Sequence, residues 1–448
     1  MASTYLTRTQ STPTSTRIAT FSFWCKRSST GSYEYIISTK NSGSARDGIA
    51  FSADDDLDVR FNAGASSPIR VQTSRKFRDS SGFYHILVAL DTTQATASNR
   101  VKIYVNGVQE TSMVTSNYPS QNYDFSLNAT SSYATIIGKN GLADDAYFNG
   151  LLTHFHAVDG QAYAPTVFGE TDSTSGIWKP KTAPSVTYGN NGFFLKMENS
   201  GAMGTDSSGN SNTFTVSGTL TQNVDTPSNN FITINPLDNY YPACTFSNGN
   251  TTVATGNNYS YCQSTIYVNK GKWYWEVKAV SKASGADEFM IGIQGKSATG
   301  TNSPAQSNNG ITYYKDGDTY GFGGGATSYG NSYTVGDIIG VALDCDNNKL
   351  YFSKNGTWQN SGDPTSGATG TGALAITDPN DVPQGGYSPV GGAYTSVSHT
   401  LSFNFGQGYF GTTAVASANA DDGGLGAMEY DVPANYRILC TKNIKDYG

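Results

Sequence analysis

Apolar and polar residues alternate along many short stretches of this chain, and the alternation predicts β-strands. Successive side chains of a strand point to opposite faces of a sheet, so residues of one parity share a face. In residues 17–26 the polar parity contains Thr20 and Ser22. The apolar parity of the same segment consists of Ala19, Phe21, Phe23 and Cys25. This segment is therefore predicted to be a sandwich strand with one buried face and one wet face.

Two further strands are predicted to end at tight hairpins. One lies in residues 100–107 and the other in residues 349–356, and both end with Asn-Gly. This pair best tolerates the two positive φ angles of a type I′ turn. The sequence Val-Ala-Leu-Asp precedes each hairpin, at residues 88–91 and 341–344. We interpret the match as one type of fold used twice, and not as proof of a duplication.

The composition favours an all-β protein. Only 14% of the 448 residues are charged, whereas the chain contains 50 Gly and 29 Tyr. Gly and short polar residues disfavour long helices, while aromatic and β-branched residues suit a sheet. The length exceeds what one core usually supports. We expect two antiparallel β-sandwich domains, at residues 1–178 and 243–448. A Gly/Asn/Ser-rich, partly ordered segment at residues 179–242 is expected to join them and to add strands.

Charge and hydropathy exclude several classes of partner. The net charge is -7 and no run of Lys or Arg occurs, so nucleic acid and anionic membranes are poor partners. No stretch approaches the roughly 18 apolar residues of a spanning helix, and the first residues lack the features of a secretory signal. The five Cys are scattered and odd in number, which indicates synthesis in a reducing cytoplasm.

The titratable residues do not form a recognisable catalytic pattern, so we expect no enzymatic activity. A glucanase needs two appropriately spaced carboxylates, and the seven Glu are dispersed. Asp54, Asp56 and Asp58 can share a strand face, but we interpret them as a solvated edge or a cation site. His154 and His156 would point the same way on a strand, yet no third metal ligand is near in sequence. A polysaccharide-degrading enzyme is the weaker alternative.

Calcium is the one cofactor that the sequence leaves open. Carboxylate and amide oxygens alternate at Asp206 and Asn210, and Asp144-Asp145 forms a second candidate ledge. The residues 344–348 show the same alternation, but Asp and Asn favour tight turns, and a turn is our interpretation there. No other cofactor is required by the pattern.

Many tyrosines lie in Gly/Asn-rich segments rather than in clean strand alternations. Tyr offers a flat apolar face and a hydroxyl that stays wet, which suits a recognition surface. The alternative for each one is packing over the end of a sandwich. The candidate ligand-binding residues are Trp358, Tyr313, Tyr314, Tyr329, Tyr333, Tyr118, Tyr123, Tyr240 and Tyr241.

Residues from about 267 to 443 resemble a SPRY domain. The resemblance rests on Gly-Lys-Trp-Tyr-Trp-Glu-Val at 271–277 and on blocks at 291–293, 320–322, 335–344, 352–356, 387–389 and 403–406. It implies a bent, concanavalin-like antiparallel sandwich that binds a partner through loops and has no catalytic residues. Residues from about 1 to 170 resemble a laminin-G-like or concanavalin A-like lectin/glucanase domain, through residues 21–24, 84–91, 102–107 and 148–152. Both domains would then be jelly rolls.

The order of these blocks resembles virion structural proteins of tailed bacteriophages. This resemblance implies a tail fibre or surface adhesin, made in the host cytoplasm and exposed on the virion. Its sandwich loops would bind a host-surface glycan or receptor, and it would contact other virion proteins. A homo-oligomer, with a trimer as the common form, is also implied. A capsid or tail decoration protein with purely structural contacts is the alternative.

Overall fold

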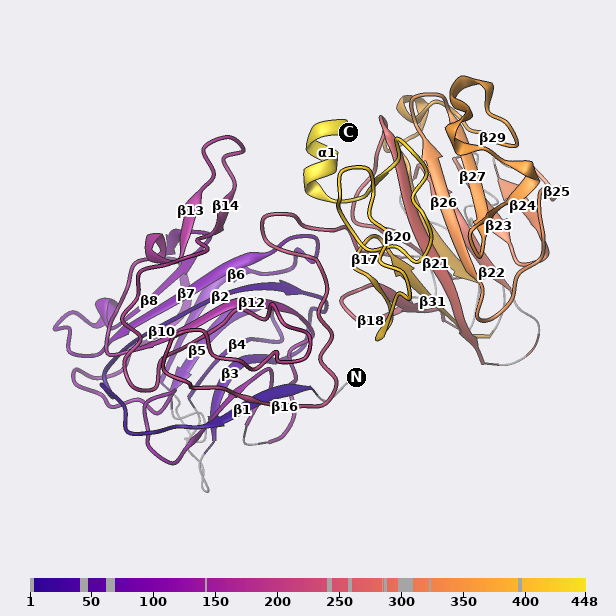
Figure 1. Cartoon of the computed structure of the whole chain (residues 1–448). Helices are drawn as coiled ribbons and strands as arrows, with labels where there is room; N and C mark the ends of the chain where they lie inside the picture. Colours follow the sequence, from indigo (N-terminus) through magenta and orange to yellow (C-terminus); the bar gives the residue numbers. More distant parts are fainter. Residues whose placement is uncertain are drawn as a thin grey trace. The chain divides into compact units, whose positions relative to one another are not determined.

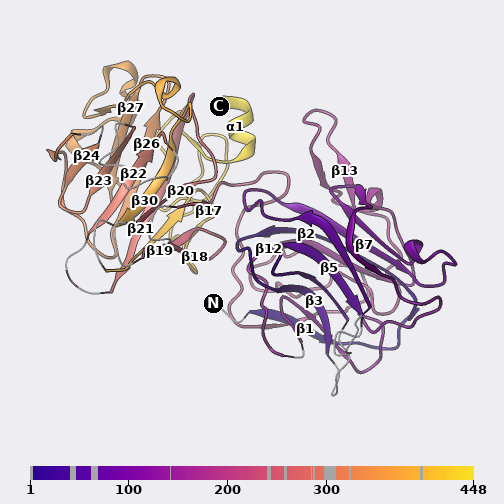
Figure 2. The same cartoon turned by 180° about the vertical axis from the view of Figure 1, so that it is seen from behind.

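The computed structural model describes residues 4–40, 47–61, 69–141, 143–239, 244–256, 260–283, 285, 288–296, 309–321, 324–393 and 397–448. The chain forms two compact units, unit 1 at Met1–Gln222 and unit 2 at Asn223–Gly448 (Figures 1 and 2). Strands build both units. The all-β prediction with two antiparallel sandwiches is therefore confirmed.

Unit 1 contains two large sheets. In spatial order, the eight-stranded sheet consists of β10 (Met113–Asn117), β6 (Ile69–Lys76), β5 (Asp56–Phe61), β4 (Gly48–Phe51), β3 (Glu34–Lys40), β11 (Ala134–Ile137), β1 (Tyr5–Thr9) and β16 (Thr215–Ser217). The six-stranded sheet consists of β15 (Phe193–Leu195), β12 (Gly150–Asp159), β2 (Ile18–Arg27), β7 (Tyr84–Asp91), β8 (Val101–Val105) and β9 (Val108–Glu110). All pairings in both sheets are antiparallel.

The apolar parity of each strand in unit 1 faces a shared core. Phe21 and Phe23 of β2 pack there with Val59 of β5 and Val71 of β6, and all four are fully buried. The opposite face of β2 is not wet, contrary to the prediction. Thr20 is fully buried and its hydroxyl donates to the Gln161 carbonyl at 2.8 Å, so the loop after β12 covers this face.

A separate hairpin projects from unit 1 and is formed by β13 (Gly169–Thr171) and β14 (Trp178–Pro180) (Figure 1). Its Trp178 ring lies 3.1 Å from the position that a Cβ would take on Gly107. Gly107 ends the turn between β8 and β9, where Asn106 and Gly107 have φ of +49° and +82°. The predicted Asn-Gly hairpin is therefore present.

Unit 2 is the second sandwich. Its seven-stranded sheet has the order β17 (Ile234–Asn239), β20 (Ser260–Ser264), β30 (Ser388–Ala393), β22 (Phe289–Gln294), β23 (Gly310–Tyr314), β24 (Asp318–Gly321) and β25 (Thr327–Ser328). The facing sheet runs through β18 (Thr245–Ser247), β19 (Thr252–Ala254), β31 (His399–Asn404), β21 (Lys272–Lys282), β26 (Ile338–Asp344), β27 (Lys349–Lys354) and β28 (Thr357–Trp358), with β29 (Leu374–Ala375) on β27 and β34 (Arg437–Ile438) on β21.

The core of unit 2 lies between these sheets and includes Trp273 and Trp275, both fully buried. Asn355 and Gly356 link β27 to β28 with φ of +48° and +79°, as in the hairpin of unit 1. The small sheet β32 (Tyr409–Phe410) and β33 (Thr413–Ala414) precedes the C-terminal helix α1 (Thr441–Tyr447). Among the described residues, no helix is long and apolar enough to cross a membrane.

The segment expected to connect the domains, residues 179–242, is divided between the units. Its β15 pairs with β12 and its β16 pairs with β1, so both strands extend the sheets of unit 1. Its β17 pairs with β20 of unit 2. The boundary between the units lies after Gln222.

Candidate functional site

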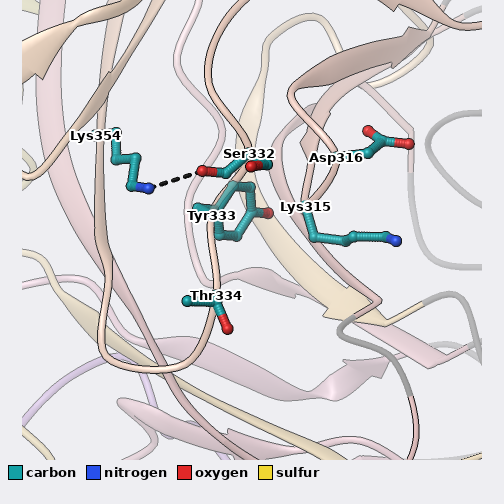
Figure 3. A pocket seen from close by; sticks show the side chains of 6 residues that line it. All are labelled: Lys315, Asp316, Ser332, Tyr333, Thr334 and Lys354. Carbon is teal, nitrogen blue, oxygen red and sulfur yellow. Dashed lines mark hydrogen bonds between the residues drawn. The ribbon is translucent and has the colours of Figure 1, made fainter.

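A hollow of about 480 Å³ lies in unit 2 (Figure 3). Three segments form it: the turn after β23 supplies Lys315 and Asp316, the loop before β26 supplies residues 332–334, and the end of β27 supplies Lys354. Figure 3 shows the two lysines on opposite sides of Tyr333. The lining residues other than the tyrosine carry charged or hydroxyl groups, so the hollow offers hydrogen-bonding groups to a ligand.

Each lysine of the hollow lies near one carboxylate. Lys354 Nζ donates to the Ser332 carbonyl at 2.7 Å and lies 3.2 Å from Asp337 Oδ2. Lys315 Nζ lies 3.9 Å from Glu288 Oε1, which is a looser contact. The lysine side chains are 28% and 26% exposed for Lys315 and Lys354, so both are partly accessible to solvent.

Asp337 ties the loop of the hollow to the Asn-Gly hairpin. Its carboxylate accepts the Thr334 N–H at 2.9 Å and the Asn355 side-chain amide at 2.7 Å. Burial by itself acts to raise the pKa of Asp337, but these hydrogen bonds and Lys354 outweigh it, and the net shift is downward. Asp337 is therefore ionised at neutral pH and holds the loop and the lysine together.

Buried tyrosines fix the loop that lines the hollow through hydrogen bonds to its backbone and to neighbouring strands. The Tyr333 hydroxyl donates to the Tyr313 carbonyl at 3.0 Å, and the Tyr313 hydroxyl donates to the Asn331 carbonyl. The Tyr329 hydroxyl accepts the Phe352 N–H at 3.2 Å. These three tyrosines were predicted to present their rings to a ligand. They are 0%, 6% and 3% exposed for Tyr313, Tyr329 and Tyr333, so all three are buried and position the loop, and Tyr333 also lines the hollow.

Tyr314 and Trp358 also differ from the expected open anchors. Tyr314 is buried on the outer face of the seven-stranded sheet against Met290, and its hydroxyl donates to Glu288. Trp358 is half-buried, and its ring packs edge-on against Tyr274 and Tyr351 at centroid distances of 6.3 and 6.5 Å. The rings of Tyr314 and Trp358 therefore both pack against other side chains.

The remaining aromatic candidates lie in unit 1 or outside the described residues. Tyr118 and Tyr123 are half-buried against the core of unit 1, and the Tyr123 ring lies 6.0 Å from that of Phe61. Burial raises the pKa of Tyr123 to about 12. Tyr240 and Tyr241 lie outside the described residues.

The candidate calcium ligands are engaged by hydrogen-bond donors. Asp206 Oδ1 accepts the Phe194 N–H at 2.9 Å and Asp206 Oδ2 accepts the Asn212 N–H at 2.8 Å. Asn210 points its amide nitrogen, not its oxygen, at the Gly192 carbonyl. This geometry is that of a turn. A cation would have to compete with these donors for the carboxylate lone pairs.

The second candidate ledge is occupied in the same way. Lys139 donates to Asp144, and Asp145 Oδ1 accepts the Asn140 amide at 2.9 Å. Within the ranges that the structure describes, no group of three or more His, Cys, Asp or Glu could hold a metal ion.

The acidic run near residue 56 is neither a solvated edge nor an open cation site at its buried positions. Asp56 is 1% exposed and accepts Lys76 Nζ at 2.9 Å. Asp58 is fully buried, and Arg60 Nε and Arg70 Nε both donate to it at 2.8 Å. The basic partners of these carboxylates lie later on the same strand or on β6. The spacing of the acidic residues by itself therefore did not predict the ion pairs.

The histidine pair does not project as expected, because the strand is irregular. The pairing of β12 with β2 shifts between Thr153 and His156, and His154 has φ of +47°. His156 stacks on Phe194 with centroids 3.8 Å apart, and its Nδ1 lies 2.9 Å from the Tyr188 hydroxyl. Burial lowers the pKa of both histidines.

A buried Ser-His contact was not found from the sequence. Ser22 Oγ lies 2.8 Å from His85 Nε2, and the Trp178 indole donates to His85 Nδ1 at 2.9 Å. Ser22 and His85 come from the neighbouring strands β2 and β7, where they are diagonal to each other because Ser22 lies opposite Leu87, while Trp178 comes from the projecting hairpin. The alternation of β2 places Ser22 on the outer parity, which was the only local signal.

The fold and these contacts define a protein of two concanavalin-like β-sandwich domains with a loop-lined polar hollow in the second. Residues 2–167 match the concanavalin A-like lectin/glucanases superfamily, and residues 272–377 match the SPRY domain. Both domain resemblances are therefore confirmed.

Curated relatives match part of the chain. Ran-binding protein 10 of Danio rerio is 34% identical over 88 residues, which cover 19% of this chain and 14% of that protein. The Ran-binding proteins 9/10 homolog of Drosophila melanogaster is 31% identical over 88 residues, or 19% and 9% of the two chains. ATP-dependent RNA helicase DDX1 of Xenopus laevis is 35% identical over 105 residues, or 21% and 12%. The matches thus span only a small part of each relative.

Two solved structures are also similar. The SPRY domain of human HERC1 is 18% identical with a TM-score of 0.30, and covers 38% of this chain and 96% of that chain. A heptameric SAP-like pentraxin from Limulus polyphemus is 18% identical with a TM-score of 0.26, and covers 36% and 71%.

The curated relatives correct the expected origin and location. They are proteins of animals and not virion components. The prediction of a phage tail fibre or adhesin on the virion, and its alternative of a capsid or tail decoration protein, are therefore wrong. The blocks that led to this prediction are sandwich strands and turns, and such elements specify a fold rather than a source or a location.

Proposed function

We propose that the chain is a non-enzymatic binding protein whose unit 2 holds a polar peptide segment of a protein partner in the hollow lined by Lys315, Asp316 and Lys354. The observation that carries the proposal is a preformed hollow lined by two partly exposed lysine side chains. A pre-organised loop binds with a smaller entropy cost than a mobile one. The buried tyrosines and Asp337 supply that order.

A protein ligand is also supported by the relatives. Two of them are named for binding Ran. The absence of catalysis is supported by the state of the carboxylates, because Asp56 and Asp58 are buried in ion pairs and are unavailable as an acid and base pair.

Selection of peptides from an mRNA-displayed random library against the full chain tests this function. We expect the selected peptides to lose affinity by at least roughly tenfold against Lys315→Glu, because the substitution replaces an ammonium group of the lining by a carboxylate beside Asp316 and Glu288. Lys445→Glu in α1 is the matched control, since this exposed lysine lies outside the hollow. Selected peptides that bind the Lys315→Glu variant as well as the natural chain would contradict the proposal.

A further inference from the structure

Two arginines lie directly opposite each other on the outer face of the eight-stranded sheet in unit 1. Val59 and Val71 face the core, so their neighbours Arg60 on β5 and Arg70 on β6 face outward. The strand register pairs Arg60 with Arg70. Like charges directly opposite on a sheet repel each other, so this pairing needs a compensating group.

Asp58 compensates for one of the two charges. Its Oδ1 accepts Arg70 Nε at 2.8 Å, and its Oδ2 accepts Arg60 Nε at 2.8 Å and a hydrogen bond from the Tyr33 hydroxyl. The Arg60 guanidinium also lies over the Tyr33 ring, 4.7 Å from its centroid. One carboxylate beneath two guanidinium groups leaves a local excess of one positive charge, in a protein whose net charge is -7.

Among the residues that the structure describes, the next charged group along this face does not remove the excess. Asp56 on the same face of β5 is paired with Lys76 at 2.9 Å and accepts the Gln72 amide. Residues 62–68, which join β5 to β6 in sequence, contain no charged residue. Solvent reaches both arginines, because their side chains are 18% exposed for Arg60 and 27% exposed for Arg70. Asn117, exposed and opposite Arg70 on β10, adds a neutral polar group.

We propose that Arg60 and Arg70 form a binding site for an oxyanion, either a carboxylate or a sulfate. The anion would lie over the outer face of β5 and β6 (Figure 1) and take the guanidinium N–H groups that Asp58 does not use. Guanidinium groups recognise such anions through paired, charge-assisted hydrogen bonds. Asp58 and Tyr33 fix the two arginines in place before the anion arrives. The site belongs to unit 1 and does not depend on the function proposed for unit 2.

Thermal unfolding and direct titration of the full chain test the site. The probes are sodium sulfate and sodium glucuronate, with sodium chloride at equal ionic strength and glucose as controls. Sulfate also stabilises proteins without binding, but that effect does not saturate. We expect a saturable rise in the unfolding midpoint with sulfate or glucuronate. Binding of both probes indicates recognition of the anion itself, and binding of glucuronate alone indicates a carboxylate carried on a sugar.

Arg70→Gln is expected to weaken the titrated affinity by about tenfold or more, and Arg70→Lys, which keeps the charge but loses the fork, to weaken it less. Arg75→Gln is the matched control on β6, because Arg75 is paired with Glu110. If Arg70→Gln does not fold, the comparison of Arg70→Lys with Arg75→Gln decides. Absence of saturable binding by both anions, or equal binding by the Arg70 and Arg75 variants, overturns the proposal.

Discussion

The indole N–H of Trp178 donates to Nδ1 of His85 at 2.9 Å, and this contact fixes the tautomer of the imidazole. An indole nitrogen only donates, so Nδ1 accepts and the ring proton lies on Nε2. Nε2 faces Ser22 Oγ at 2.8 Å. Burial lowers the pKa of His85 to about 3. The imidazole therefore donates to the serine and does not take its proton, so this pair is not a catalytic dyad in this arrangement.

Replacing Trp178 by Phe should destabilise unit 1. The change keeps a ring but removes the donor, and it leaves Nδ1 of the fully buried His85 without this partner. We expect a loss of about 1–3 kcal/mol in the free energy of unfolding, measured by urea denaturation. Ile177→Ala is the matched control, because its side chain is exposed next to Trp178 in sequence. Equal stability of the Trp178→Phe variant and the natural chain would refute the structural role.

The sequence predicted features that depend on adjacent residues, but it did not predict contacts between residues that are distant along the chain. The Asn355-Gly356 turn was predicted because the chemistry of two adjacent residues decides the positive φ angles. The burial of Tyr313 was not predicted, because its hydroxyl partner is a carbonyl 18 residues away. The pairing of Asp58 with Arg70 likewise required knowledge that β6 folds back beside β5. The alternation of apolar and polar residues predicts the sandwich. The hydrogen-bond or ion-pair partner of each polar side chain depends instead on which strands become neighbours.

Glu276 on β21 should make the stability of unit 2 depend on pH. This carboxylate is fully buried, and it accepts the N–H groups of Glu429 and Tyr430, both at 2.8 Å. Burial raises its pKa to about 7, although these hydrogen bonds act in the opposite direction. Between pH 4.5 and about 7 the unfolded chain loses this proton while the folded chain keeps it. The stabilisation that the folded chain gains by binding this proton more tightly is therefore fully present below pH 4.5 and decreases as the pH rises. It no longer changes above about pH 7.

The variant Glu276→Gln isolates this contribution. A shift from 4.5 to about 7 corresponds to roughly 3 kcal/mol, so the difference in unfolding free energy between natural chain and variant should change by about that amount between pH 4 and pH 8. Urea denaturation across this range measures it. Glu429→Gln, whose carboxylate accepts the Ala416 N–H, is the control and should keep the slope of the natural chain. A constant difference for Glu276→Gln across the range would contradict the assignment.

Removal of calcium should leave unit 1 unchanged, because donors of the chain itself fill the candidate ledge at Asp206. Excess EGTA is expected to leave the thermal unfolding midpoint where it was. Asp206→Asn should lower stability by about 1–2 kcal/mol, because Oδ2 accepts both Ser208 Oγ and the Asn212 N–H at 2.8 Å. A saturable rise of the midpoint with calcium, lost in Asp206→Asn, would instead establish a metal site.

Gly356 should tolerate substitution less well than another glycine with a similar backbone. Gly356 has φ of +79°, and a Cβ there would lie 2.6 Å from Tyr430 Cδ1. Gly424 has φ of +71° with nothing within 4 Å of the same position. Alanine at either site incurs about 1–2 kcal/mol of backbone strain, but only at Gly356 must a ring also move.

We therefore expect Gly356→Ala to be the more destabilising variant in urea denaturation, and Tyr430→Ala to reduce the excess in a double-mutant cycle. The backbone N–H of Tyr430 is held by Glu276 at 2.8 Å, so the ring cannot be displaced by moving its main chain without breaking that bond. Equal losses for Gly356→Ala and Gly424→Ala would show that the side chain rotates away freely. A larger loss at Gly356 would show that the hairpin and the C-terminal segment are packed as one unit.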